Sequence, residues 1–194
     1  MYKGIVFDLD GTLIDSPLCF QSIRQELDIP DGHYILEYLE LLPPPVKKEK
    51  LQRLQDIEVE AAQKAVPFPG VLHLLEDLNE REIPVGIFTR NCRVAALHVV
   101  DNFRMTINMV ITRDDAPAKP DPSGLQKFLA QWNLEGENLL FVGDFRFDIE
   151  CGKRAGVRTA LFTNGGDVAE DLEPDYIVHH YSAFWECIRP KKRS

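Results

Sequence analysis

The hydrophobic positions of the chain follow two alternating patterns. Short, continuous apolar runs, each followed by polar or glycine-containing residues, predict buried strands at residues 3–8, 85–89, 109–112, 139–142 and 159–162. Between several of them, apolar residues recur at helical spacing, over residues 71–78, 94–100 and 125–132. Because strands buried on both faces read as continuous apolar runs, this order predicts an α/β fold, a Rossmann-like parallel sheet flanked by helices.

Residues 15–66 interrupt this alternation. They contain no convincing strand, and their apolar spacing predicts three helices, which end near Pro30, at residues 43–45 and before Pro67. We therefore predict a core of residues 1–14 and 67–194 with a small all-helical cap, residues 15–66, inserted after the first strand. The proline-containing ends of this insertion read as stiff hinges. The insertion has two interpretations, a movable lid over the site and a helical subdomain with a structural role alone.

Composition narrows the classes of partner. The 194 residues are 44% hydrophobic, enough for a real core, and carry a net charge of −9, which disfavours nucleic acid and anionic membranes. A small anionic substrate then needs a locally positive site, such as a metal ion with a lysine. The four cysteines are scattered without a CxxC pair, which favours reduced thiols. With no credible signal peptide or membrane-length apolar segment, we expect a cytoplasmic protein.

Two carboxylates stand where the first predicted strand ends. Asp8 and Asp10 belong to the segment DLDGT at residues 8–12, in which Gly11 permits the chain to turn. A carboxylate can attack phosphorus when a cation screens its charge from that of the phosphate. A second carboxylic acid can protonate the leaving oxygen and later deprotonate water. The pair is compatible with phosphoryl transfer, but alone it is only suggestive, because the DxD pattern also occurs in surface loops.

Further polar residues follow the other predicted strands, at the edge where parallel sheets place their active sites. Thr89 ends the second strand and can hydrogen-bond phosphate oxygens. Lys119 follows the third strand and is a counter-charge for a phosphate and for Asp8. Asp144 and Asp148 follow the fourth strand, and such hard oxygen ligands suit Mg²⁺.

Taken together, four segments match one family pattern in order and in the strands that they follow. They are DLDGT at 8–12, Thr89, Lys119 before PDP, and GDFRFD at 143–148. On these residues the chain resembles the haloacid dehalogenase-like (HAD) superfamily, in the phosphatase branch with a small helical cap after the first strand. The resemblance implies Mg²⁺-dependent hydrolysis of a small phosphorylated metabolite through an aspartyl-phosphate, with a phosphoglycolate-phosphatase-like substrate.

The resemblance also implies a role for each matching residue. Asp8 would be the nucleophile and a magnesium ligand, and Asp10 the general acid/base with its backbone carbonyl on the metal. Thr89 would bind the transferring phosphoryl group, and Lys119 would bridge it to the nucleophile. Asp144 would bind the metal directly, and Asp148 would lie outside the ligand set and orient a metal-bound water or the lysine. Backbone N–H groups near Leu9, Asp10 and Arg90 would hold the phosphate.

Some features depart from the family pattern. Phe145 stands where serine is common after the metal-binding aspartate, and Arg90 stands where asparagine is frequent. Arg90 is open to two interpretations, a contact to the leaving group or an ordinary salt-bridged surface arginine. The insertion is also short for a cap, which would leave the cleft more open.

Two other functions are compatible with the same residues. One is a phosphomutase of the same family, which would need a cap that restrains water. The other is a phosphate-binding interaction protein without turnover, against which the intact set of Asp8, Asp10, Lys119 and Asp144 argues. A dehalogenase is disfavoured because it lacks an acid/base carboxylate at the position of Asp10. The sequence leaves open whether the chain is a monomer or a homodimer.

Overall fold

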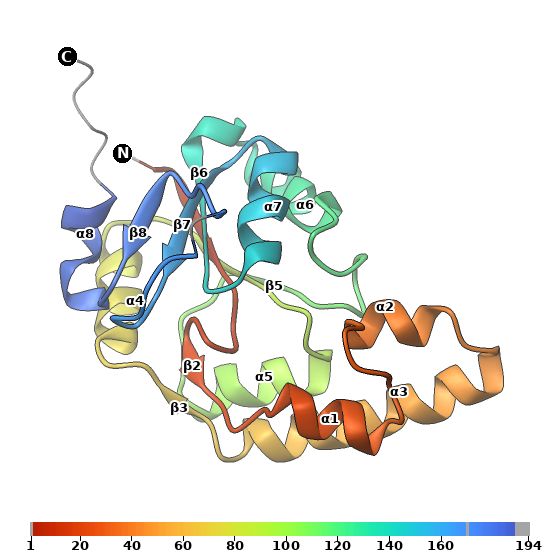
Figure 1. Cartoon of the computed structure of the whole chain (residues 1–194). Helices are drawn as coiled ribbons and strands as arrows, with labels where there is room; N and C mark the ends of the chain where they lie inside the picture. Colours follow the sequence, from red (N-terminus) through yellow and green to blue (C-terminus); the bar gives the residue numbers. More distant parts are fainter. Residues whose placement is uncertain (1, 170, 189–194) are drawn as a thin grey trace.

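A six-stranded sheet forms the centre of the protein, for which a computed structural model describes residues 2–169 and 171–188. All neighbouring strands in it are parallel, in the order β5–β4–β1–β6–β7–β8. Figure 1 shows β6, β7 and β8 side by side. The strands are Gly4–Phe7 (β1), Val85–Phe88 (β4), Met109–Ile111 (β5), Leu139–Gly143 (β6), Arg158–Phe162 (β7) and Tyr176–Val178 (β8). This parallel sheet with its flanking helices confirms the predicted α/β fold and all five predicted strands.

Helices cover both faces of the sheet. Successive residues of a strand point to opposite faces, so Ile5 and Phe7 pack with α4, α5 and α8, whereas Val6 packs with α6 and α7. Both faces are therefore buried, which is why the strands read as continuous apolar runs. The covering helices are α4 (Val71–Glu80), α5 (Arg93–Asn102), α6 (Ser123–Trp132), α7 (Arg146–Ala155) and α8 (Phe184–Cys187).

Three of these elements were not predicted from the sequence. Strand β8 and helix α8 have three and four residues, too few to show a period. Helix α7 is longer, but its buried face includes Asp148 and Gly152, which an apolar pattern does not count. That omission matters, because α7 carries a residue of the candidate site.

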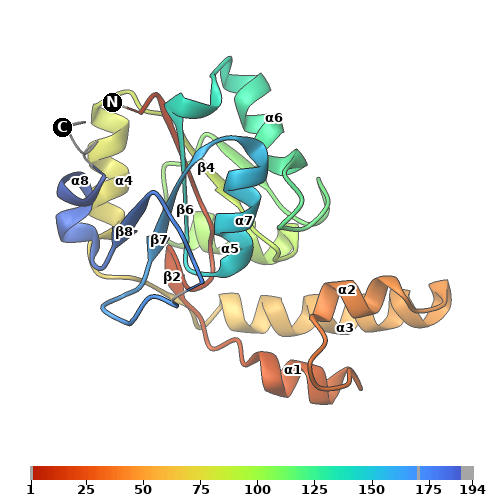
Figure 2. The ribbon, with the colours of Figure 1, turned by 45° about the horizontal axis from the view of Figure 1, so that its top comes forward.

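The insertion folds as three helices, as predicted. Helices α1 (Phe20–Glu26), α2 (Ile35–Glu40) and α3 (Pro44–Ala62) share a small apolar cluster around Ile23, Leu39 and Leu54. Figure 2 shows them grouped together beside one end of the sheet. The prolines at 43–45 were expected only to stop the second helix. Helix α3 in fact begins at Pro44, because proline has no N–H to lose and a suitable φ in the first helical turn.

The two ends of the insertion are tied to each other. Strand β2 (Ile14–Asp15) pairs antiparallel with β3 (Val66–Pro67), and the Phe68 N–H donates to the Leu13 carbonyl at 3.0 Å. The expectation that residues 15–66 hold no strand is therefore wrong at both ends, because two-residue strands show no period. Both connections to the core consequently lie side by side.

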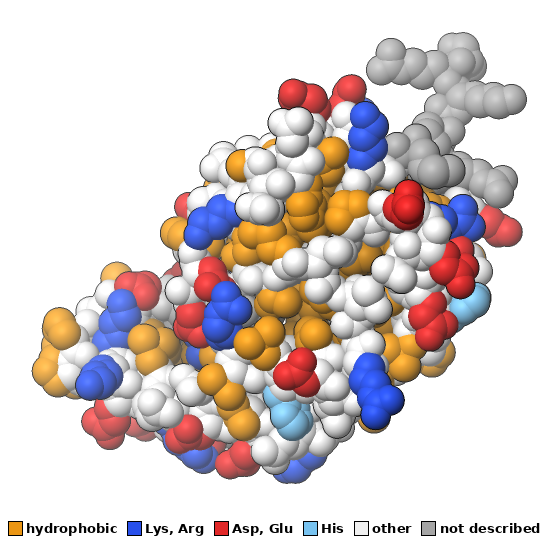
Figure 3. All heavy atoms as spheres, turned by 180° about the vertical axis from the view of Figure 1, so that it is seen from behind, with side chains coloured by type: hydrophobic (Ala, Val, Ile, Leu, Met, Phe, Trp, Pro, Cys, Tyr) orange, Lys and Arg blue, Asp and Glu red, His pale blue; other side chains and the backbone are white. Residues whose placement is uncertain are grey.

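The exterior is mixed in character. On the face opposite to that of Figure 1, hydrophobic side chains gather over the middle of the core, with acidic and basic side chains interspersed around them (Figure 3). Among the described residues, no helix has the length and apolar character that crossing a bilayer requires. The expected cytoplasmic location and the expected absence of nucleic-acid and membrane partners stay predictions.

Candidate active site

A tight turn at the end of β1 places the first candidate residue. The Asp8 N–H donates to the Val142 carbonyl of the neighbouring strand β6 at 2.8 Å, which fixes Asp8 at the carboxyl edge of the sheet. The Leu9 carbonyl then accepts three backbone N–H groups, those of Thr12 (3.3 Å), Leu13 (2.9 Å) and Ile14 (3.1 Å). The chain therefore reverses within six residues and keeps residues 8–12 at this edge.

Glycine is required within this turn. Gly11 has a φ of +79°, a conformation that residues with a side chain rarely adopt. A Cβ atom there would also lie 2.2 Å from Oδ2 of Asp144, which follows β6. Thr12 joins the two carboxylates, with its hydroxyl 3.5 Å from Asp8 Oδ2 and 3.4 Å from Asp144 Oδ1. The turn thus brings Asp8 and Asp144 into one site.

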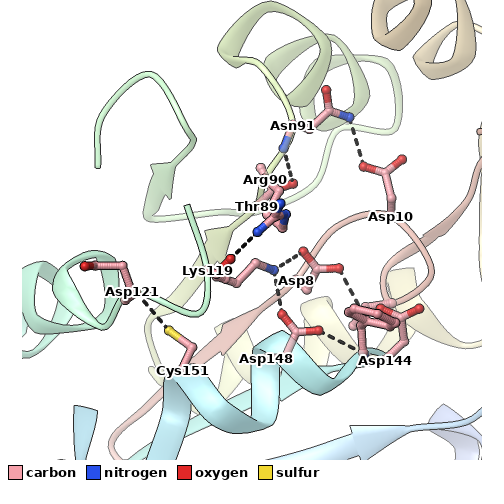
Figure 4. Close-up of polar contacts among 12 residues, drawn as sticks. Asp8, Asp10, Thr89, Arg90, Asn91, Lys119, Asp121, Asp144, Asp148 and Cys151 are labelled. Carbon is pink, nitrogen blue, oxygen red and sulfur yellow. Dashed lines mark hydrogen bonds and ion pairs between the residues drawn. The ribbon is translucent and has the colours of Figure 1, made fainter. Parts of the chain in front are cut away.

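A buried lysine lies between two aspartates. Lys119 is 2% exposed, and its Nζ pairs with Asp8 Oδ1 and lies 2.6 Å from Asp148 Oδ1 (Figure 4). The other oxygen of Asp148 accepts the Phe145 N–H at 3.0 Å, which caps the start of α7. Burial alone lowers the pKa of Lys119, but Asp148 and Asp8 outweigh it and raise that pKa above its usual range. Lys119 therefore stays charged.

Three carboxylates converge beside this lysine. One oxygen each of Asp8, Asp144 and Asp148 lie within 4.8 Å of one another. Burial raises the pKa of Asp8 well above its usual range, with Asp148 and Asp144 adding to the effect of burial and Lys119 opposing it. Part of the Asp144 side chain remains accessible to solvent, but many protein atoms surround its carboxyl group. The resulting loss of solvation, together with the negative charge of Asp148, raises the pKa of Asp144 to about 7. Crowded oxygen ligands of this kind fit a divalent cation such as Mg²⁺.

Asp10 lies beside this cluster rather than in it. In Figure 4 its carboxylate points toward Asn91, while the carboxylates of Asp8 and Asp148 point toward Lys119. It accepts hydrogen bonds from Ser16 Oγ at 2.6 Å and from Asn91 Nδ2 at 2.9 Å. Burial raises the pKa of Asp10, although both hydrogen bonds lower it. A carboxyl group that holds its proton more tightly than usual is suited to act as an acid.

Asn91 and Ser16 are two site residues to which the sequence analysis gave no role. Asn91 reaches Asp10 across 81 positions of the sequence, and Ser16 does so from the first residues of the insertion. Asn91 N–H also donates to Thr89 Oγ1 at 3.0 Å, which leaves the hydroxyl proton of Thr89 available to another acceptor. The spacing of the motifs gives no signal for these contacts, because they depend on how the loops are placed.

Arg90 turns out to be salt-bridged. Its two terminal nitrogens lie 2.9 and 2.8 Å from the carboxylate oxygens of Glu37 on helix α2, and one of them also donates to the Lys119 carbonyl. Its guanidinium lies 4.8 Å from the centre of the Phe147 ring. The side chain therefore joins the insertion to the core, while a phosphate contact through the backbone N–H near Arg90 stays a prediction.

A cavity of about 420 Å³ lies over these residues. We call its core side the floor, and the apolar residues on its other side the roof. The floor includes Asp8, Asp10, Thr89, Asn91, Lys119, Asp144 and Asp148. The roof consists of Leu18, Phe20, Ile23, Tyr34, Ile35, Leu36 and Leu54 from the insertion, joined by Phe145 and Phe147 from the start of α7.

The structure thus brings together nearly all the residues chosen from the sequence. Asp8, Lys119, Asp144 and Asp148 are in mutual reach, and Thr89 and Asp10 line the same cavity. Leu9 differs, because its side chain is fully buried in the core and only its backbone is left to meet a phosphate. A metal contact from the Asp10 carbonyl also stays a prediction.

Comparison with known proteins now decides the family. The family model described as haloacid dehalogenase-like hydrolase matches residues 5–162, which include every residue of the floor. The chain belongs to the haloacid dehalogenase-like hydrolase family. This confirms the resemblance drawn from the four sequence segments, and the prediction that the chain is an enzyme, a hydrolase.

Members of this family with known names align over nearly the whole chain. The phosphoglycolate phosphatase of Aquifex aeolicus is 30% identical over 91% of this chain and 92% of its own length. The pyrophosphatase PpaX of Halalkalibacterium halodurans is 27% identical over 97% and 98%. A crystal structure of a hydrolase from Pseudomonas syringae superposes with a TM-score of 0.78 at 20% identity, covering 95% and 96% of the two chains. The last similarity supports the fold.

Proposed function

We propose that this HAD-family hydrolase is a Mg²⁺-dependent phosphatase that hydrolyses a small phosphomonoester through an aspartyl-phosphate on Asp8. The observation that carries the proposal is the grouping of Asp8, Asp144 and Asp148 around the buried Lys119. These residues lie at one edge of the sheet, where they can serve as a nucleophile, its counter-charge and oxygen ligands for a cation. The named phosphatase and pyrophosphatase relatives support phosphoryl chemistry.

The chain's own residues account for each step. An Asp8 oxygen bonds to phosphorus while the ester oxygen leaves and takes the proton held by Asp10. Lys119 and the Thr89 hydroxyl hold the transferring group. Asp10 then accepts a proton from water as the water oxygen attacks phosphorus, which frees Asp8 and releases inorganic phosphate. Asp8 and Asp144, with the Asp10 carbonyl, would hold Mg²⁺, which would supply the positive charge that lets an anionic nucleophile approach an anionic phosphate.

Helices α1–α3 are proposed to act as the cap, with the core at residues 1–14 and 67–194 and the cap at 15–66. This is supported by the cavity, whose roof comes mainly from these helices, and by the Glu37–Arg90 pair at its side. Asp148, paired with Lys119, is proposed to orient that lysine rather than to be a main metal ligand.

The test is phosphate release from para-nitrophenyl phosphate with and without Mg²⁺. Asp8→Asn is expected to lower turnover about 1,000-fold or more and to abolish covalent labelling by phosphate, because the nucleophile is lost. Asp10→Asn should still form the phosphoryl-enzyme but release it slowly. Asp31→Asn, an exposed carboxylate of the insertion, is the matched control and should match the wild type.

Two results would contradict the proposal. One is covalent labelling that survives Asp8→Asn, which would place the nucleophile elsewhere. The other is tight phosphate binding without turnover of any phosphate ester, which would favour a binding protein. Pyrophosphate belongs in the same assay, because one relative is named for its hydrolysis.

A further inference from the structure

The two sides of the cavity differ sharply in polarity. The floor carries the site carboxylates and Lys119, whereas seven of the nine cavity residues from the insertion are apolar or aromatic, the other two being Arg24 and Glu58. The phosphoryl group and its cation are accounted for by the floor. The roof therefore faces the remaining part of the substrate, the alcohol that leaves. The chemical character of this alcohol should therefore match that of the roof.

Three aromatic side chains in this cavity are unusually accessible. Phe20 on the insertion is 60% exposed, and Tyr34 and Phe145 are each 46% exposed. Large apolar side chains that gather at a cavity and remain in contact with water mark a surface that buries an apolar partner. Phe147 supports two of them, with ring centroids 4.6 Å from Tyr34 and 5.2 Å from Phe145 in edge-to-face arrangements. Edge-to-face packing leaves other ring faces open to a ligand.

The cationic residues on the cavity wall are mostly already paired. Among the described residues that line it, Lys119 is paired with two aspartates and Arg90 with Glu37, which leaves Arg24. Glu58 on the same wall is itself paired with Arg113, so the pairing leaves neither charge free for a ligand. A small anionic leaving group such as glycolate would find a single cation and would leave the apolar roof hydrated.

We infer that the preferred substrate is a phosphate monoester of an apolar alcohol that carries a ring, which packs against Phe20, Tyr34 and Phe145. This rests on the proposed function and deepens it by naming the leaving group. The chemistry of the floor is unchanged: the ester oxygen leaves with the proton from Asp10, and phosphate is released. What the roof adds is selectivity, because burying a ring there favours the ring-bearing ester.

The test compares benzyl phosphate with ethyl phosphate, whose leaving alcohols have nearly equal acidity, so the ratio reports binding of the ring. The wild type is expected to favour benzyl phosphate in kcat/KM by about tenfold or more. Phe20→Ala and Phe145→Ala should each lower this ratio about fivefold. Both side chains are substantially exposed, so their removal should leave the fold intact. Leu41→Ala, a 77% exposed residue of the insertion outside the cavity, is the control and should leave the ratio unchanged.

Binding separates a failure of this inference from a failure of the proposed function. Benzylphosphonate and ethylphosphonate have no ester bond to hydrolyse. Calorimetry in the presence of Mg²⁺ therefore measures how much the ring contributes to binding, whether or not the protein is catalytically active. Benzylphosphonate is expected to bind about tenfold more tightly. Equal affinities would overturn the inference. So would a preference for phosphoglycolate over both esters that disappears in Arg24→Gln, because the cavity would then recognise an anionic leaving group through Arg24.

Discussion

The floor and the roof of the cavity are held in opposite ways. In the floor, Lys119 and Asp148 are 2% exposed, and the Lys119–Asp8 pair joins residues 111 positions apart in the sequence. In the roof, helices α1 and α2 contribute the exposed Phe20 and the partly exposed Ile35 and Leu36, and the ion pair from α2 to Arg90 of the core involves a Glu37 side chain that is 46% exposed. The floor is charged and mostly buried, whereas the part of the roof on α1 and α2 is apolar and is linked to the core by a solvent-accessible ion pair.

Under the proposed function, this difference separates chemistry from selectivity. The parallel sheet forces the carboxyl ends of β1, β4 and β6 together, so the residues that follow them must meet. The chemistry is thus built into the core. Helices α1 and α2 can change their side chains without disturbing that arrangement, because the apolar cluster around Ile23, Leu39 and Leu54 is separate from the two clusters of the core. The insertion joins the core cluster near the end of α3, at Ala62 and Ala65. The predictions below test the two sides, from the largest expected effect to the smallest.

Crowding of carboxylates in the floor predicts a conflict between activity and stability at Asp144. Asp144→Asn should lower Mg²⁺-dependent turnover about 100-fold or more, since it removes a proposed metal ligand. The same variant should be more stable than the wild type without metal at pH 8, because it removes a charge beside Asp148. Solvent screening at this exposed position limits the gain in free energy of unfolding to about 1 kcal/mol.

The carboxyl group of Asp144 also sets the sign of the pH dependence of folding stability. Folding raises the pKa of Asp144 to about 7, so between pH of about 4 and 7 the folded protein holds a proton that the unfolded chain has lost. The stability contributed by this proton is complete below pH of about 4 and disappears as the pH rises through 7. Melting temperatures in EDTA should fall over this range, less steeply for Asp144→Asn. Addition of Mg²⁺ should raise them most at pH 7 and above, and a variant that responds to Mg²⁺ like the wild type would contradict the assignment.

The floor was largely predictable from the sequence, and the roof was not. Asp8, Thr89, Lys119 and Asp144 each follow a continuous apolar run, and a parallel sheet leaves such residues only one edge to occupy. The roof depends on which sides of the three helices of the insertion face the core. Apolar spacing located those helices, but it does not distinguish an apolar residue that packs in the small cluster from one that lines the cavity. Leu39 is of the first kind and Phe20 of the second.

Polar contacts between distant loops could not be predicted from the sequence either. The hydrogen bond from Asn91 to Asp10 depends on the direction of a side chain that no periodicity reports. Arg90 illustrates the same limit, because the sequence left open a contact to the leaving group and a surface salt bridge. Only the placement of Glu37 on α2 distinguishes them.

The inner end of the insertion should resist change far more than its outer end. Glu58 on α3 is 6% exposed; one of its oxygens pairs with Arg113, and the other accepts the Cys92 N–H at 3.1 Å, next to the start of α5. Glu58→Gln leaves Arg113 buried without its counter-charge and should lower the free energy of unfolding by about 3 kcal/mol. Glu60→Gln, on the same helix but exposed, is the control and should change it by less than about 0.5 kcal/mol. Urea denaturation measures both, and equal effects would show that α3 is not anchored through Glu58.

The smallest effect is expected at the outer end, where Arg90 meets Glu37. This pair has bidentate geometry, but its side chains are 23% and 46% exposed, so water and salt screen it. A double-mutant cycle with Arg90→Ala and Glu37→Ala should give a coupling free energy below about 1 kcal/mol, and less in high salt. A salt-independent coupling as large as the loss at Glu58 would mean that α2 is fixed as firmly as α3. The contrast between a buried floor and a lightly held roof would then be wrong, because the insertion would be one rigid wall. A weak coupling combined with a raised KM for benzyl phosphate in Glu37→Ala would instead indicate that the pair holds the roof in place over the substrate.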